Sequence, residues 1–202
     1  HYPLRRQRQM CIRDRFRDWT KGKSSQEARI SIYERIRDIP YAIIPELTSP
    51  QNYADILKVE KGSCTPKHFL LCDMYQRLGI LILYVVYTFR WDELEVDYPP
   101  KLKNLAKDLP VNHHLACKAD IEGKLVLLDA TLDLALEGLG LPVNRDWDGF
   151  SDTLLPISPL DEEMYHPSEA KLMSPSFDEK SLAFYRELNL WLENARRGRL
   201  KG

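Results

Sequence analysis

The stretch Gly62–Ile80, GSCTPKHFLLCDMYQRLGI, places a cysteine at the point where a glycine–serine turn becomes a helix. One side of this helix is formed by residues at helical spacing: Cys64, His68, Leu71, Tyr75 and Leu78. Pro66 is compatible with the first turn, because the first N–H groups of a helix have no partner within it. Gly79 is a suitable stop. The sequence therefore predicts a helix from Cys64 to Leu78 with a cysteine in its first turn.

Two more helices are predicted before this stretch. Ser24 can cap a helix with apolar residues at helical spacing, and Pro40 ends it. Ser49 and Pro50 are the residue types favoured at the N-cap and the first helical position, so a second, shorter helix is expected there. A further short helix is expected at Lys101–Lys107.

Three segments have the character of β-strands. They are Ile80–Phe89, Asn112–Ile121 and Lys124–Leu128, and the last two are joined at Glu122-Gly123, a hairpin turn. Alternate residues make one face of the second strand apolar: Leu115, Cys117, Ala119 and Ile121. This order predicts an α+β domain whose helices are segregated from a small antiparallel sheet.

Length and composition are those of an ordinary globular protein. The chain has 202 residues, 44% of them hydrophobic and 29% charged, and its formal net charge is -1. Such a length suits one domain, and so small a net charge gives no field that would attract nucleic acid or an anionic membrane. No apolar run reaches the roughly 18–20 residues that span a bilayer. The four cysteines form no CxxC pair, which indicates reduced thiols and a cytoplasmic location.

The two ends of the chain differ in composition from the middle. Residues 1–20 are basic, lack the apolar segment of a secretory signal, and contain QMCIRDR, which resembles translated sequencing-adapter sequence. We therefore expect residues 1–20 to be a non-native or disordered leader and residues 21–202 to form a single domain. A proline-rich segment at about residues 155–175 is expected to wrap over the core, followed by an amphipathic helix, Phe177–Arg196.

Cysteine, histidine and aspartate occur in that order on the central elements. Cys64 begins a helix, His113 and His114 stand on a strand, and Asp129 follows the next strand. A helix N-terminus favours the thiolate form of cysteine. A histidine can take the thiol proton and later protonate the leaving group, and an aspartate can fix the tautomer of the imidazole. These residue types predict an activated thiol.

Together these segments resemble the transglutaminase-like superfamily of papain-related Cys-His-Asp proteins. The resemblance covers about Ile32–Asp133: IYERIRDIPY is similar to the lead-in helix, GSCTPKHFLLCDMYQRLGI to the nucleophile helix, and HHLACKADIEGKLVLLDAT to the hairpin. It implies a papain/transglutaminase-like core and a catalytic triad, with Cys64 as nucleophile, Asp129 as orienting acid and one histidine of the pair as base.

The tandem histidines leave the identity of the base open. Alignment back from Asp129 through the hairpin turn favours His114, whereas His113 shares the apolar face of its strand and is the alternative. The chain also departs from the family pattern. Transglutaminases carry Gln-Cys-Trp at the nucleophile, where this chain has Ser63-Cys64-Thr65, and the proline of the family's DPT is Ala130. These departures disfavour glutamine–lysine cross-linking.

The expected function is cysteine-dependent acyl transfer or hydrolysis of an amide or peptide-like bond through a thioester. Hydrolysis is favoured, because nothing in the sequence marks an amine-acceptor site. A catalytically inactive transglutaminase-like binding module is the alternative. The substrate is expected to be a protein, a peptide or a small amide, with no cofactor and no nucleic-acid or membrane partner; the sequence leaves the oligomeric state open.

A zinc site is a further alternative. Cys64, His68 and Cys72 recur at four-residue spacing, and His113 or His114 could complete a tetrahedral set. Zinc sites usually use tighter paired spacings, so we expect no metal ligands here. His68 is then expected to be a packed or partly exposed helix residue, and Cys72 and Cys117 to be core thiols.

Overall fold

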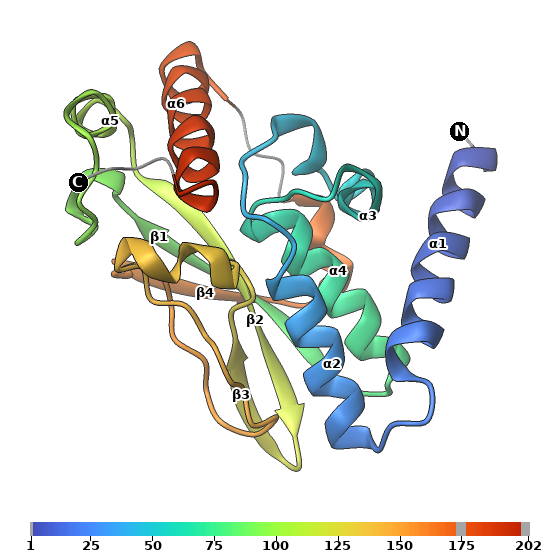
Figure 1. Ribbon diagram of the computed structural model, residues 1–202. Coiled ribbons are helices and arrows are strands. Elements are labelled where there is room, and N and C mark those ends of the chain that lie inside the picture. Colours follow the sequence, from blue (N-terminus) through green and yellow to red (C-terminus); the bar gives the residue numbers. More distant parts are fainter. Residues whose placement is uncertain (1, 173–176, 199–202) are drawn as a thin grey trace.

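The computed structural model describes residues 2–172 and 177–198 and has an α+β architecture (Figure 1). Its α-helices are α1 (Tyr2–Thr20), α2 (Ser25–Arg37), α3 (Ile56–Val59), α4 (Cys64–Arg77), α5 (Pro100–Lys107) and α6 (Glu179–Arg196). Its strands are β1 (Ile82–Phe89), β2 (Asn112–Ile121), β3 (Lys124–Leu128) and β4 (Asp161–Tyr165). Short 3-10 helices lie at Pro45–Leu47, Tyr53–Asp55, Trp91–Glu93, Leu134–Leu139 and Pro167–Leu172. The predicted α+β class, with helices segregated from an antiparallel sheet, is confirmed.

Helices α1, α2 and α4 are layered onto the sheet in that order. Helix α1 packs on α2, α2 packs on α4, and α4 packs on β1 and β2 (Figure 1). The predicted cap of α2 is present: the Ser24 side chain accepts the N–H of Glu27, and the Glu27 carboxylate accepts the N–H of Ser24. Helix α4 is therefore covered on one side by α2 and on the other by strands.

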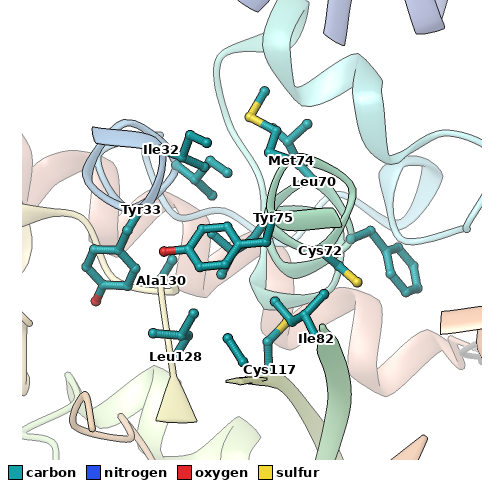
Figure 2. Close-up of a cluster of buried hydrophobic side chains, with 14 of the residues drawn as sticks. Ile32, Tyr33, Leu70, Cys72, Met74, Tyr75, Ile82, Cys117, Leu128 and Ala130 are labelled. Atoms are coloured by element: carbon teal, nitrogen blue, oxygen red, sulfur yellow. The ribbon is translucent and has the colours of Figure 1, made fainter. Parts of the chain in front are cut away.

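The main core fills the space between α2, α4 and the sheet. Figure 2 shows side chains from all three elements meeting there: Ile32, Tyr33, Leu70, Cys72, Met74, Tyr75, Ile82, Cys117, Leu128 and Ala130. The two buried phenols are satisfied, because the Tyr75 hydroxyl donates to the carbonyl of Arg29 at 2.9 Å and that of Tyr33 donates to the carbonyl of Asp129 at 2.8 Å. Tyr33 thereby ties α2 to the chain segment that carries Asp129.

The sheet is antiparallel, with the strand order β3-β2-β1-β4. Glu122 and Gly123 both adopt positive φ angles (56° and 83°) in the turn between β2 and β3, which confirms the predicted hairpin. Strand β3 pairs only with residues 117–121 of β2. Residues 112–116 therefore extend beyond the end of β3, and one edge of this part of β2 has no strand beside it among the described residues.

Residues 2–20, expected to belong to a non-native or disordered leader, lie in α1, in which Ile12 and Trp19 are buried in the main core. The expected non-native origin of this segment stays a prediction. The helix expected to start at Ser49 begins later, as the 3-10 turn Tyr53–Asp55 followed by α3. Ser49 and Pro50 lie in the bend and turn that precede it.

The segment expected to wrap over the core contains a strand that the sequence did not predict. Strand β4 pairs with β1 at the edge of the sheet, and only Tyr165 of its five residues is not exposed. An edge strand needs no apolar alternation, which is why the acidic sequence DEEMY gave no strand signal. Residues 173–176 of the expected segment lie outside the described part of the chain. None of the described helices is both long and apolar enough to cross a lipid bilayer.

Candidate active site

Cys64 is the first residue of α4 and is half-buried. Its N-cap, Ser63, has an extended backbone, and the chain reaches it through Gly62, which pairs with the main chain of Pro40 and Ala42. A Cβ atom on Gly62 would lie 2.9 Å from Cγ2 of Ile56. The missing side chain of this glycine therefore lets the backbone turn into α4 close to the core.

His114 and Asp129 form a buried hydrogen-bonded pair. The Nε2–H of His114 donates to Oδ2 of Asp129 at 2.5 Å, and the two residues are only 3% and 2% exposed. Oδ1 of Asp129 accepts the N–H of Thr131 at 2.9 Å, and the N–H of Asp129 donates to the hydroxyl of Thr153 at 2.7 Å. The carboxylate comes to His114 because β3 ends at Leu128, one residue before Asp129, while β2 continues.

His114 lies close enough to the Cys64 thiol for its charge and hydrogen bonding to shift the pKa of the thiol, and Cys64 shifts the pKa of His114 in turn. The Sγ of Cys64 also lies 3.9 Å from the hydroxyl of Thr65. Nε2 is already engaged by Asp129, so Nδ1 is the ring nitrogen left to face the sulfur. The backbone N–H of Leu115 is also directed at the thiol, where β2 has run past the end of β3. The structure thus brings Cys64, His114 and Asp129 together from three segments of the chain.

Charge within this group reverses the effect of burial on all three residues. Burial raises the pKa of the Cys64 thiol, but the charge and hydrogen bond of His114, aided by the N–H of Leu115, hold that pKa below its usual range. Burial lowers the pKa of His114, but Asp129 and Cys64 together raise it to about 10. Burial raises the pKa of Asp129, which His114 then lowers. Both shifts favour a thiolate beside an imidazolium.

His68 joins the nucleophile helix to the segment after Asp129. Its ring is fully buried; Nδ1–H donates to the carbonyl of Cys64 at 2.8 Å, and Nε2 accepts the N–H of Ala130 at 3.0 Å. Burial lowers the pKa of His68 to about 4, so the ring is neutral at physiological pH. The sequence predicted a packed or partly exposed residue and missed this bridge; the four-residue spacing from Cys64 was the available signal.

Lys67 makes a second link to the same segment. Its Nζ is fully buried and donates to the carbonyls of Arg37 at 2.9 Å and Thr131 at 2.7 Å. Burial lowers the pKa of Lys67 to about 7, and a neutral amine has two N–H groups, which match these two carbonyls. Nothing in the sequence distinguished this lysine from a surface residue.

The other candidates stand apart from the group. His113 is exposed, and the structure places His114, not His113, against Asp129. Cys72 and Cys117 are buried; burial raises the pKa of Cys72 to about 12 and also raises the pKa of Cys117. Among the described residues, no three His, Cys, Asp or Glu side chains are grouped to hold a metal ion. His68 moreover has both ring nitrogens committed to the main chain.

No protein-family model and no curated protein matches the chain. Among solved structures, it is similar to a chain described as "a Putative Cysteine Protease from Cytophaga hutchinsonii", with 19% sequence identity and a TM-score of 0.43. The match covers 78% of this chain and 50% of the other, so the chain spans about half the length of that structure. The side chains around Cys64, rather than this likeness, are what bear on its chemistry.

Proposed function

We propose that this protein is a cysteine-dependent hydrolase of an amide or peptide-like bond, acting through a thioester on Cys64. The observation that carries the proposal is the convergence of Cys64, His114 and Asp129, with a hydrogen bond from the imidazole to the carboxylate and an imidazole close enough to the thiol to lower its pKa. The order of these residues and the types of the elements that carry them support a transglutaminase-like core.

The chemistry begins with attack of the Cys64 thiolate on the substrate carbonyl carbon, which forms a C–S bond and moves the carbonyl π electrons onto oxygen. The N–H of Cys64 is among the first of α4 and has no partner within the helix, so it can donate to this oxyanion. When the tetrahedral species collapses, the C–N bond breaks and the His114 imidazolium gives its proton to the leaving amine.

The thioester is resolved by water in the second half of the reaction. Neutral His114 takes a proton from water as its oxygen attacks the thioester carbon, the C–S bond breaks, and a carboxylic acid leaves. The thiolate–imidazolium pair is then restored. Asp129 holds the ring orientation and stabilises the imidazolium throughout. Hydrolysis is placed before transfer to an amine, because the described lining of the cavity beside Cys64 has no carboxylate to hold an ammonium group.

A covalent acyl-enzyme tests this proposal directly. The protein would be incubated with p-nitrophenyl acetate, and its intact mass measured with and without hydroxylamine, which cleaves thioesters. We expect one acetyl adduct that hydroxylamine removes, absent in Cys64→Ala and retained in the matched control Cys72→Ala. An adduct that persists in Cys64→Ala, or no adduct in the unmodified chain, would instead favour an inactive binding module.

A further inference from the structure

A cavity with a volume of about 540 Å³ lies beside Cys64 and His114. One wall is a face of α6 that includes Tyr185, Leu188 and Trp191, and another wall includes Phe89 and Trp91 at the end of β1. This volume is in the range of pockets that enclose most of a small-molecule ligand. The cavity is therefore large enough for a bulky group attached to the carbonyl that Cys64 would attack.

Outside the Cys64–His114 pair, whose proposed opposite charges cancel, the cavity has few ionisable side chains. Asp, Glu, Lys and Arg make up 29% of the chain, yet none of them lines the cavity within the part of the chain that the structure describes. Away from that pair, a charged group entering this space would lose its hydration without gaining an Asp, Glu, Lys or Arg partner of opposite charge. An uncharged, largely apolar group would instead gain from burial against the aromatic walls.

The α6 wall is fixed to the rest of the site. The side-chain amide of Asn189 accepts the N–H of Ile43 and donates to its carbonyl, both at 2.9 Å. Arg196 donates to the carbonyl of Tyr41 at 2.9 Å and to the carboxylate of Asp133 at 2.5 Å. The α6 wall of the cavity is therefore held in place by residues outside α6.

We propose that this cavity binds the acyl side of the substrate and selects a bulky, uncharged, aromatic or aliphatic group. The inference rests on the proposed function, because it takes Cys64 as the reacting atom. It goes further in naming which amides are cleaved: those with an apolar acyl group, rather than an acidic or basic one.

The test uses alkylating reagents that share one reactive group and differ only in the attached arm. In each, the thiolate displaces iodide and an S–C bond forms. Rates of Cys64 modification would be measured in a Cys11→Ser background with iodoacetamide, N-(naphthylmethyl)iodoacetamide and 4-(iodoacetamidomethyl)benzoate, each divided by its rate with glutathione. We expect the naphthyl reagent to be faster than iodoacetamide by about tenfold and to saturate, since its ring surface is buried. The carboxylate reagent should show no gain.

Variants locate the effect in the cavity. Leu141, a half-buried residue of the lining, would be changed to Glu, and the matched control is Leu154→Glu, at a position that is 59% exposed and outside the lining. Leu141→Glu should lower the ratio of naphthyl to iodoacetamide rates by about threefold or more, and the control should leave it unchanged.

The possible outcomes separate this inference from the function on which it rests. If Cys64 reacts quickly with iodoacetamide but the naphthyl arm brings no gain, or the carboxylate arm brings the larger one, the cavity assignment is overturned and the reactive thiol stands. If Cys64 reacts no faster with iodoacetamide than Cys72 does, the proposed function fails first.

Discussion

Replacement of His68 tests whether the bridge between α4 and the segment after Asp129 supports the site. In His68→Phe, the N–H of Ala130, a fully buried residue, loses its acceptor, and the carbonyl of Cys64 loses one of its donors. An unpaired buried donor costs about 1–3 kcal/mol and a lost hydrogen bond about 1 kcal/mol. We therefore expect the free energy of unfolding to fall by roughly 2–3 kcal/mol. His68→Gln keeps a donor and an acceptor on a similar reach, and should lose about 1 kcal/mol or less.

Urea unfolding followed by tryptophan fluorescence would measure both variants, with the midpoint expected to move at an unchanged slope. A second readout separates positioning from stability: the iodoacetamide rate of Cys64 against pH. Since the pKa of His68 is about 4, it does not titrate near neutrality, so His68→Gln should leave the midpoint of the profile in place, while His68→Phe lowers the rate. Wild-type stability and rate in His68→Phe, or a shifted midpoint in His68→Gln, would refute the reasoning.

Three further predictions address neighbouring residues. Asp129→Asn removes the charge that raises the pKa of His114, so the Cys64 alkylation rate should fall about tenfold near pH 6 and converge with wild type at alkaline pH. Equal rates in variant and wild type at both pH values would contradict this. The pKa of Lys67 is lowered to about 7 in the folded protein, so above that pH the unfolded chain binds more protons than the folded one. The unfolding free energy of wild type minus that of Lys67→Met should therefore rise as pH rises from 7 towards 9. A difference in urea titrations that stays flat or falls would contradict this. Gly62→Ala should lower the midpoint of thermal unfolding, because the added Cβ meets Ile56 and overpacking costs about 1–3 kcal/mol. The control Gly138→Ala has open space around its Cβ and should leave the midpoint unchanged. Equal midpoints in the two variants would argue against the close approach of Gly62 to Ile56.

The parts of the fold that local signals specify were predictable from the sequence. Helix α4 starts at Cys64 and ends near Gly79, whose φ of 77° suits a helix stop, and the turn at Glu122-Gly123 fixes the hairpin. Strand β4 was missed, because it is an exposed edge strand held by main-chain pairing to β1 rather than by an apolar face.

The parts of the site that depend on how elements are placed were only partly predictable. The order Cys64, His114, Asp129 could be read from the chain, but the apolar-face pattern of the strand also kept His113 open as the base. The structure distinguishes the two histidines, because the ring of His114 is bonded to Asp129 whereas His113 is exposed. The bridging role of His68 depends on where α4 meets the segment after β3, and helical periodicity does not contain that information.

The proposed function requires that folding gives Cys64 a thiolate at neutral pH, paired with His114. The ultraviolet absorbance of the thiolate against pH measures this, taken as the difference between the Cys11→Ser protein and the same protein carrying Cys64→Ala. We expect this difference to titrate well below the ordinary thiol pKa of about 8.5, and His114→Ala to return it towards that value. A midpoint at or above the ordinary value, unchanged in His114→Ala, would show that folding does not activate this thiol.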